Sequence, residues 1–359
     1  MVEEPVEGLA VPGGGFPFLS RIACWLIVTL LIPLAPAVAA QEAVPIVDVH
    51  AHPARFIGQM TTDAFISRAL RAVKEYRIEK IIILPPPTPH RGAYAAQLWK
   101  FVDAIKAHPN SFAFGGGGEQ LNPLILTTPA DAVTPDVRRR FEAMAEKLID
   151  SGVSVLGEFV AEHFSFGQHP YMSVAPDHPL LLLLADVAAR RNVPIDLHME
   201  AVPTDRPMPH LKSGRRRDRP QADNPARLKA NLPAFRRLLA HNARAKIVWA
   251  HAGWDNTGER TVRLMRQLLA GHPNLYMSMK LHSRLPGLTI PFAFFGGIQE
   301  EWLALFREFP DRFVIGSDSF YDEDPGDHLN PIRDFVNALP VELSRKIARE
   351  NAIELYHLK

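Results

Sequence analysis

Cysteine is nearly absent from this chain, and its absence limits the chemistry available. The one cysteine among 359 residues is Cys24, which lies within the first 40 positions. From residue 41 onward there can be no disulfide bond, thiolate metal ligand or cysteine nucleophile. A metal ion bound by that part of the chain must be held by histidine, aspartate or glutamate.

The chain also has little excess charge of either sign. Lys and Arg total 40 and Asp and Glu total 39, so there is no overall basic field to bind nucleic acid. No GxGxxG motif follows the first predicted strand, which argues against a dinucleotide-binding open sheet. The Gly115–Gly118 run lacks the Lys-Ser/Thr of a phosphate loop and is typical of a flexible turn. We therefore expect a small-molecule substrate.

The main uninterrupted apolar run lies near the N-terminus. Arg21 precedes it, it covers residues 22–32, and it breaks at Pro33. Small residues follow at 37–40, which is the layout of a secretory signal cleaved before Gln41. The run is too short and too broken by proline to favour a membrane span.

We therefore expect two parts, a signal segment at 1–40 and a single domain at 41–359. The mature protein is then periplasmic or secreted, with no stable membrane span. The alternative is a membrane anchor that is not cleaved, because the leading segment is acidic and has only one arginine before the apolar run.

After residue 43, strand-like apolar runs alternate with amphipathic helical stretches. The predicted strands are 46–50, 80–84, 111–115, 153–159, 193–198, 246–250, 274–279 and 312–317. The predicted helices are 61–76, 93–107, 135–151, 177–191, 231–242, 257–271, 298–309 and 328–338, with a last one at 340–355. Eight strand-then-helix units predict an α/β fold of the (β/α)8 TIM-barrel class. An open, doubly wound sheet is the structural rival.

Side chains that bind metals stand at or near the C-terminal ends of five predicted strands. They are His50 and His52, Glu158, His198, His251 and Asp318. A parallel barrel gathers the C-terminal ends of its strands around one axis, so these residues are predicted to meet. One histidine at a strand end is more often structural than a ligand, but the joint arrangement favours a metal site.

His50 and His52 are two residues apart on the first predicted strand. Side chains on a strand alternate with period two, so both imidazoles face the same way. They could bind one divalent ion at about 2.0–2.1 Å. Asp48 shares that face, where it either orients a ligand by a hydrogen bond or only caps a buried polar position.

These residues resemble the amidohydrolase superfamily, and most closely its amidohydrolase-related branch. The resemblance covers residues 44–356 and is strongest at Val47–His52 and at Gly316-Ser317-Asp318. The lone His198 and His251 support it. It implies a distorted TIM barrel with metal-dependent chemistry. The branch contains amide and lactone hydrolases and some nonoxidative decarboxylases.

The resemblance also implies roles for individual residues. His50, His52 and Asp318 would bind one metal ion. His198 would be a further ligand of that ion or of a second. His251 would bind the second ion, or act catalytically by hydrogen bonding to water or substrate.

Many members with two ions carry a carbamylated lysine after the fourth strand. This chain has Glu158 there and no lysine nearby, so the glutamate either bridges two ions or forms an ion pair at the barrel mouth. One or two ions are expected. Histidine and carboxylate ligands suit zinc, our choice, and also accept manganese or iron.

The hypothesis is a hydrolase that cleaves an amide, lactone or other ester bond with a metal-activated water. Asp318 is assigned as general base and then general acid. The first rival is a metal-dependent decarboxylase, which needs a cation such as Lys280, Arg284 or the arginines at 215–219 to hold a carboxylate. The second rival is a non-catalytic metal-binding barrel.

Three residues are predicted to contact substrate. Lys280 ends the seventh predicted strand, Arg284 follows closely, and Glu200 lies two residues after His198. Lys280 is equally well explained by a salt bridge at the rim. A homo-oligomer is compatible with the sequence.

Overall fold

A computed structural model describes residues 43–54, 60–89, 98–165, 169–209, 224–283, 289–321 and 323–359. The predicted signal segment, Cys24, Arg284 and the arginines at 215–219 lie outside these residues. Among the described residues, none of the helices has the length and apolar character needed to cross a membrane.

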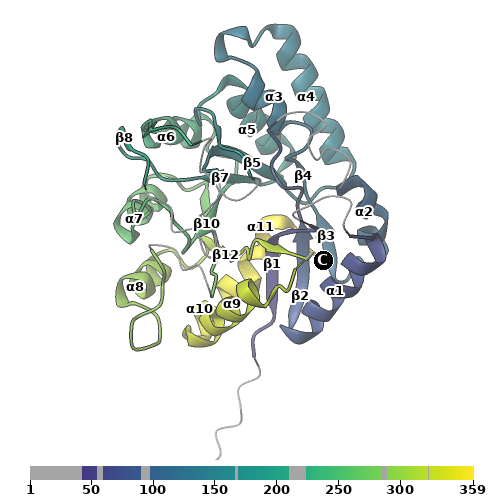
Figure 1. The fold of residues 1–359 in the computed structure, drawn as a ribbon, viewed down its shortest axis with the longest axis vertical. Coiled ribbons are helices and arrows are strands. Elements are labelled where there is room, and N and C mark those ends of the chain that lie inside the picture. The colour runs from purple at the N-terminus through teal and green to yellow at the C-terminus, as the bar shows by residue number, and fades with distance from the viewer. Residues whose placement is uncertain are drawn as a thin grey trace, which may run out of the picture. The chain divides into compact units, whose positions relative to one another are not determined.

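The domain is a TIM barrel, as predicted (Figure 1). Its strands are β1 (Ile46–His52), β2 (Ile78–Ile83), β3 (Phe112–Phe114), β4 (Gly116–Gly117), β5 (Leu156–His163), β7 (Ile195–Met199), β10 (Ile247–Ala252), β11 (Leu275–Met279) and β12 (Phe313–Ile315). They are hydrogen-bonded in the order β3-β2-β1-β12-β11-β10-β7-β5-β4. The neighbouring barrel strands are parallel, for example β1 with β2 and β12, and β7 with β5 and β10.

The third barrel position, predicted as one strand at 111–115, is irregular. Gly115 separates β3, which pairs with β2, from β4, which pairs with β5. The two short strands lie at opposite ends of the hydrogen-bonded order, so this position closes the ring. A side chain at Gly115 would collide with Leu84 and Val155, which approach its Cβ position to 2.2 and 2.7 Å.

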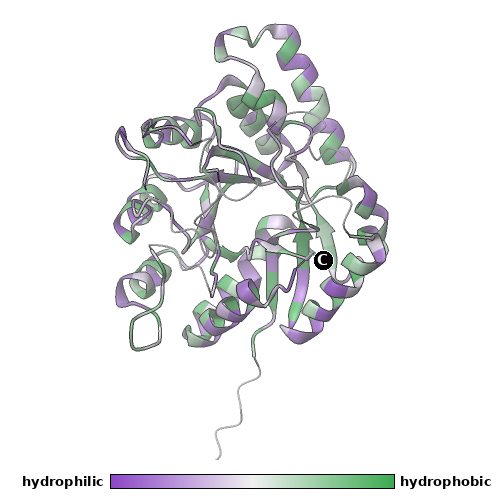
Figure 2. Ribbon diagram, in the orientation of Figure 1, coloured by the Kyte–Doolittle hydropathy of each residue, from purple (hydrophilic) through white to green (hydrophobic). Residues whose placement is uncertain are grey.

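Helices cover the outside of the barrel (Figure 1). They are α1 (Thr62–Glu75), α2 (Leu98–Lys106), α4 (Pro135–Asp150), α5 (Pro179–Arg191), α6 (Leu232–His241), α7 (Val262–Gly271), α8 (Glu300–Glu308) and α9 (Gly326–Ala338). Helix α1 buries Phe65, Ala69 and Ala72, a spacing of three and four that places them on one face. Figure 2 shows hydrophobic and hydrophilic residues mixed along these surrounding helices.

Three of these helices begin at a threonine that caps the first turn. The side chains of Thr61, Thr134 and Thr261 accept hydrogen bonds from backbone amides of α1, α4 and α7. Such a cap satisfies an amide that has no partner inside the helix, and it stabilises the helix by about 1 kcal/mol. Helix α7 begins at Val262, five residues later than predicted at 257, because Asp255 and Thr257 form a hydrogen-bonded turn there.

The C-terminal segment is less regular than the single helix predicted at 340–355. It consists of α10 (Val341–Arg345), a π-helical turn (Lys346–Glu350) and α11 (Asn351–Tyr356). Helix α11 packs on β1 and β12, and it buries Ala352, Leu355 and Tyr356 among strand residues such as Val47 and Val314. Helix α11 therefore closes part of the barrel core.

Several short elements were not predicted from the sequence. They are α3 (Asn122–Thr127), a 3-10 turn (Ala130–Ala132), β6 (Met172–Ser173), β8 (Arg206–Pro207), β9 (Arg227–Leu228) and β13 (Ser319–Phe320). Of these, β13 bears on function, because it pairs with the end of β1 through Ala51 and His52. It holds the chain after Asp318 against the strand that carries the two histidines.

Candidate metal centre

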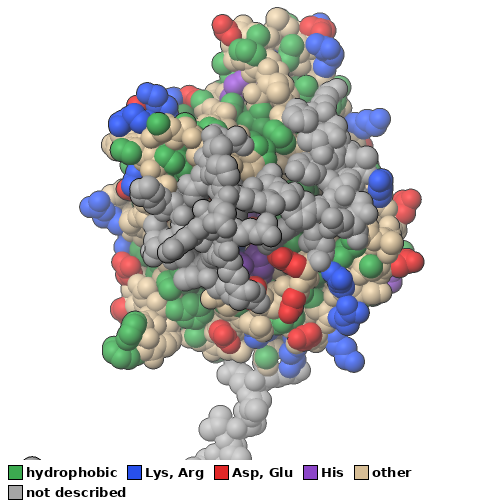
Figure 3. Space-filling view, viewed as in Figure 1, with side chains coloured by type: hydrophobic (Ala, Val, Ile, Leu, Met, Phe, Trp, Pro, Cys, Tyr) green, Lys and Arg blue, Asp and Glu red, His purple; other side chains and the backbone are tan. Residues whose placement is uncertain are grey.

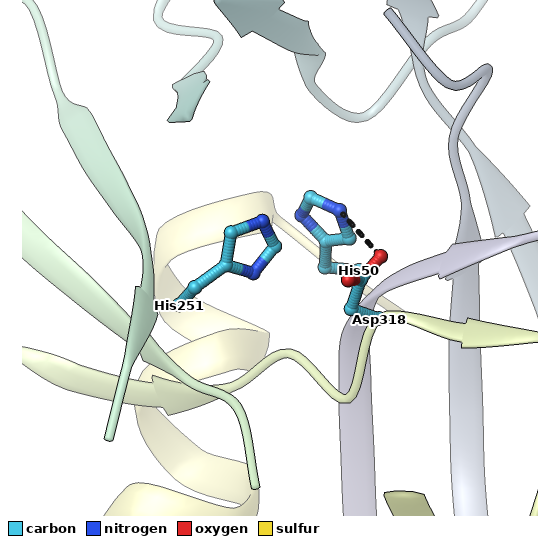
Figure 4. A group of neighbouring side chains, drawn as sticks. All are labelled: His50, His251 and Asp318. Carbon is cyan, nitrogen blue, oxygen red and sulfur yellow. Dashed lines mark ion pairs between the residues drawn. The ribbon is translucent and has the colours of Figure 1, made fainter. Parts of the chain in front are cut away.

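The six predicted ligands come together where the barrel strands end. His50 and His52 extend from β1, Glu158 from β5, His198 from β7 and His251 from β10, while Asp318 follows β12. Five of them are buried, with exposed fractions of 9% or less, and His198 is partly exposed. Histidine side chains are visible near the centre of the face shown in Figure 3. Figure 4 shows His50, His251 and Asp318 directed toward a common space.

The two imidazoles of β1 each have one ring nitrogen engaged outside this space. Nδ1 of His50 lies 3.0 Å from Oδ2 of Asp196, and Nδ1 of His52 lies 3.0 Å from the carbonyl oxygen of Leu84. A carbonyl and a carboxylate only accept, so both Nδ1 atoms carry the proton. When both imidazoles are neutral, the two Nε2 atoms, 3.2 Å apart, each carry a lone pair, and these lone pairs face each other.

Glu158 divides its two oxygens between two pairs of histidines. Oε2 lies 3.5 Å from Nε2 of His50 and 3.4 Å from Nε2 of His52. Oε1 lies 2.9 Å from Nδ1 of His198 and 3.3 Å from Nε2 of His251. This carboxylate therefore faces both halves of the cluster.

Asp318 also has two differently directed oxygens. Oδ1 lies 3.1 Å from Nε2 of His52 and 3.7 Å from Nε2 of His50. Oδ2 pairs with the ammonium of Lys280. That ammonium also lies 4.4 Å from the centre of the Trp254 ring, so a cation and an aromatic side chain hold the outer side of the carboxylate.

These residues fit a divalent ion. Three overlapping groups each bring their ligand atoms within 4.8 Å of one another: His50, His251 and Asp318; His50, His52 and Glu158; and Glu158, His198 and His251. The facing lone pairs of His50 and His52 cannot satisfy each other and require a positive charge between them. Imidazole nitrogens and carboxylate oxygens are the ligands that zinc, manganese and iron accept.

The pKa values of Glu158 and His52 are shifted because acidic and basic groups lie so close together in this cluster. Burial opposes ionisation of Glu158, but the charge of His50 and hydrogen bonds with His198 and His251 hold its pKa well below the usual value. Burial also lowers the pKa of His52, yet hydrogen bonds to Asp318 and Glu158 raise it to about 9. Without an ion, the anionic groups draw a proton into the place where a cation would be bound.

His251 differs from His52 in this respect. Burial and the nearby ammonium of Lys280 lower the pKa of His251 well below its usual value. Its imidazole is therefore neutral at ordinary pH, with a proton on one ring nitrogen and a lone pair on the other. Its Nδ1 is buried and has no hydrogen-bond partner among the described residues. Its Nε2 lies 3.0 Å from Nδ1 of His198, in the half of the cluster served by Oε1 of Glu158.

Two of the candidate ligands have left-handed backbone conformations. The φ angles are 71° at His251 and 57° at Asp318, a region that residues other than glycine seldom adopt and that costs about 1–3 kcal/mol. The amide of Asp318 donates to the carbonyl of His50 at 2.8 Å, and the carbonyl of His251 accepts from the amide of Trp254 at 3.0 Å. Surrounding structure thus fixes both conformations.

Glycine is required beside the cluster at two positions where backbones approach closely. At Gly316, an added Cβ would lie 2.8 Å from Cβ of Ser278 and 3.0 Å from Cβ of His50. At Gly157, it would lie 2.7 Å from Cβ of Asp196. These approaches bring Asp318 toward β1 and Glu158 toward β7.

The three residues predicted to contact substrate have different surroundings. Lys280 lies in the cluster, paired with Asp318. Glu200 is buried, and its carboxylate accepts from the side-chain amide of Asn256 at 2.5 Å and from the Asn256 backbone at 3.3 Å. It thus contacts the loop after β10. Arg284 lies outside the described residues.

Sequence reasoning missed Asp196, which orients His50. A signal for it existed, because Asp196 precedes His198 by two residues, just as Asp48 precedes His50. Sequence reasoning also missed Arg260, which is buried against the Trp249 ring at 3.9 Å. Arg260 donates to the carbonyls of Trp249 and Ala250, just before His251, and no sequence pattern predicts that contact.

A family model described as amidohydrolase matches residues 34–358. The chain belongs to the amidohydrolase family. The family and the His, Glu and Asp groups together support a divalent metal. A search of curated proteins finds no match.

Three solved structures are among those to which this chain is similar. A 2,6-dihydroxybenzoate decarboxylase from Rhizobium has a TM-score of 0.51 and 16% identity, covering 88% of this chain and 99% of that chain. A dihydroxybenzoic acid decarboxylase from Polaromonas sp. JS666, with bound manganese and 2-nitroresorcinol, has a TM-score of 0.45 and 13% identity, covering 88% and 97%. An amidohydrolase from Pseudomonas aeruginosa has a TM-score of 0.42 and 8% identity, covering 88% and 96%. At 16% identity, the likeness to the Rhizobium enzyme concerns the fold alone.

Proposed function

We propose that this amidohydrolase-family protein is a metal-dependent hydrolase that cleaves an amide, lactone or other ester bond of a small molecule. The observation that carries the proposal is the division of Glu158. Its two oxygens face separate histidine pairs, His50 with His52 and His198 with His251. This favours a site for two divalent ions that share the glutamate.

In this proposal, His50, His52 and Asp318 would hold the first ion, and His198 and His251 would hold the second. A bound divalent ion lowers the pKa of a water from about 15.7 to near 7 and polarises a carbonyl oxygen. Asp318 accepts the proton of the attacking water on its carboxylate and later gives a proton to the leaving group. Its pKa favours the accepting form: burial raises that pKa, but the Lys280 charge and the His52 hydrogen bond lower it well below the usual value.

Two measurements test this proposal together. Metal content of the purified protein, by mass spectrometry after loading with zinc or manganese, should approach two equivalents and fall to about one in Glu158→Gln. Glu162→Gln is the matched control. Glu162 is a buried carboxylate on the same strand, but it accepts from Tyr171 at 2.7 Å and Ser173 at 2.9 Å and not from the histidine cluster.

Activity is measured on a panel of esters, lactones and amides. Asp318→Asn should lose at least about 100-fold in turnover, the usual contribution of an acid–base group. Near-normal hydrolysis by Asp318→Asn would contradict the assigned role. If the metal-loaded wild type turns over none of these substrates, the result would count against the hydrolase proposal.

A decarboxylase is the second candidate, and one observation favours it. Lys280 is a buried cation next to Asp318 at the cluster, where it could pair with a substrate carboxylate. This reading predicts one bound ion and release of CO2 from an aromatic or unsaturated acid that has no ester or amide. Hydrolysis without CO2 release decides against it.

We further propose that the bound ion is zinc and that the mature protein is exported. We choose zinc because most of the candidate ligands are imidazoles, although manganese and iron accept the same ligand types. Activity restored by each ion in turn tests this choice. The proposed location is the periplasm or the outside of the cell. N-terminal sequencing of the mature protein should begin at Gln41, whereas an intact residue 1 would indicate an anchor.

A further inference from the structure

We propose that Asp48 and His328 are positioning residues for Asp318, and that both act by holding Ser317. Neither side chain belongs to one of the three candidate metal-binding groups, and nothing in the proposed function assigns them a part. The inference rests on the proposed metal role of Asp318. The tests below separate its failure from the failure of that role.

Asp48 holds Ser317 from the β1 side. Its Oδ1 accepts a hydrogen bond from the Ser317 amide at 2.9 Å, and its Oδ2 accepts from the Ser317 hydroxyl at 2.5 Å. The hydroxyl in turn accepts from the amide of Ser319 at 3.1 Å. Because Asp48 is two residues from His50 on the same strand, the strand that carries the histidines also carries the anchor for Asp318.

His328 holds the same residue from the α9 side. Its Nδ1 lies 2.9 Å from the Ser317 carbonyl oxygen, so this nitrogen is the donor. The imidazole is buried, with an exposed fraction of 3%, and its ring centre lies 4.5 Å from that of His282. The amide, carbonyl and hydroxyl of Ser317 are therefore all bonded to side chains of other elements.

The consequence falls on the next residue, Asp318. Its amide donates to the carbonyl of His50 at 2.8 Å, and its φ of 57° is left-handed. With Ser317 fixed on three sides and the amide of Asp318 bound to β1, the carboxylate has little freedom. It is held with Oδ1 toward His52.

His328 is not explained as ordinary core packing. Its Nε2 is buried and has no hydrogen-bond partner among the described residues. An apolar side chain of similar size would fill the space without burying an unpaired nitrogen. The imidazole is needed there for its Nδ1 donor, which reaches the carbonyl before Asp318.

The test compares His328→Leu, His328→Asn and Ser317→Ala with the wild type, full-length in each case. The leucine removes the donor, and the asparagine keeps an N–H at a similar reach. His178→Leu is the matched control, because His178 is also buried and bonds to a backbone carbonyl, Thr128, at 2.9 Å, but lies at the start of α5. Co²⁺ is titrated into metal-free protein, and the visible absorption of the bound ion is recorded.

We expect His328→Leu to bind Co²⁺ at least about tenfold more weakly, with an altered visible spectrum, as is usual when support for a ligand is lost. His328→Asn should recover most of the affinity, and His178→Leu should match the wild type in both readouts. Asp48→Asn should add little to Ser317→Ala, since both remove the same hydroxyl hydrogen bond. Wild-type affinity and spectrum in both His328→Leu and Ser317→Ala would overturn the proposal.

A second measurement needs no metal. Hydrogen–deuterium exchange at the amides of residues 317–319 should become faster in His328→Leu and Ser317→Ala and stay unchanged in His178→Leu. Unchanged exchange in both variants would refute the proposal that Asp48 and His328 hold Ser317, even if the protein binds no metal. Conversely, faster exchange in the variants, together with a wild type that binds no Co²⁺, would support the holding of Ser317 by Asp48 and His328. It would at the same time contradict the proposed metal function.

Discussion

The Nε2 atoms of His50 and His52 lie 3.2 Å apart, and neither carries a proton when both imidazoles are neutral. Their Nδ1 atoms are occupied by Asp196 and by the Leu84 carbonyl, so the ring orientations are fixed. Only a positive charge, either a proton or a metal ion, stabilises this arrangement. Proton and metal therefore compete for one place.

The first prediction concerns this competition. Although burial opposes it, hydrogen bonds to Asp318 and Glu158 raise the pKa of His52 to about 9. At pH 7 the metal-free protein thus holds a proton that an ion must displace. Calorimetric titrations in buffers of different ionisation enthalpy should show about one or more protons released per first ion.

The sign of the pH dependence follows. Apparent metal affinity should rise by about tenfold per pH unit between pH 7 and 9 and then level off, because the competing proton is gone. The stability that protonated His52 contributes to the metal-free protein is present below its ordinary pKa of 6.5 and is lost as pH rises through about 9. Metal affinity that is independent of pH and buffer would rule out the competition.

Asp196→Asn should weaken metal binding by about 10–100-fold, because the residue fixes the tautomer and raises the basicity of His50. The wild-type contact is 3.0 Å between two fully buried side chains. Asp186→Asn is a suitable control, since Asp186 forms a similar pair with His241, 3.1 Å apart, on the surface. Equal affinities of the two variants would show that Asp196 does not support the ligand.

Lys280→Met should move the acid limb of the kcat/KM profile to higher pH. Burial raises the pKa of Asp318, and the Lys280 charge is the largest influence that lowers it. Without that charge the carboxylate is protonated at a higher pH and ceases to act as a base there. An acid limb that stays in place, with a raised KM confined to carboxylate substrates, would instead assign Lys280 to substrate binding.

Arg260→Met should destabilise the fold by on the order of 3 kcal/mol, because it leaves buried carbonyls of Trp249 and Ala250 without a donor. Urea unfolding of the metal-free protein measures this loss. In Arg237→Met the change should stay within about 1 kcal/mol, since Arg237 forms an exposed pair with Asp177. A similar small change in Arg260→Met would show that the contact does not fix the end of β10.

The sequence predicted the barrel because its strands are buried on both faces and form short apolar runs. Strands β1 and β10 were placed within two residues at each end, at 46–50 and 246–250 against Ile46–His52 and Ile247–Ala252. Because parallel strands end together, the meeting of the six polar residues followed from their positions. The two-residue spacing of His50 and His52 correctly predicted that both imidazoles share a face.

The sequence could not predict which side chains of distant segments contact one another. Asp48 was expected to orient a ligand by a hydrogen bond, and its carboxylate accepts from the His50 amide at 3.3 Å. It also accepts from the amide and hydroxyl of Ser317, next to Asp318, and that contact was not foreseen. The His50–Asp196 pair joins β1 to β7, and nothing in either segment specifies that pairing. The left-handed φ of His251 and Asp318 depends on tertiary hydrogen bonds, which local propensity does not encode.

The most direct test of the metal centre is anomalous diffraction from crystals grown with excess Mn²⁺ or Zn²⁺. We predict one peak between His50, His52 and Asp318 and a second between His198 and His251. Both ions should share Glu158, with ligand distances of about 2.0–2.2 Å. Crystals with no anomalous peak within about 3 Å of the Nε2 atoms of His50 and His52, a distance beyond any ligand bond, would contradict the account.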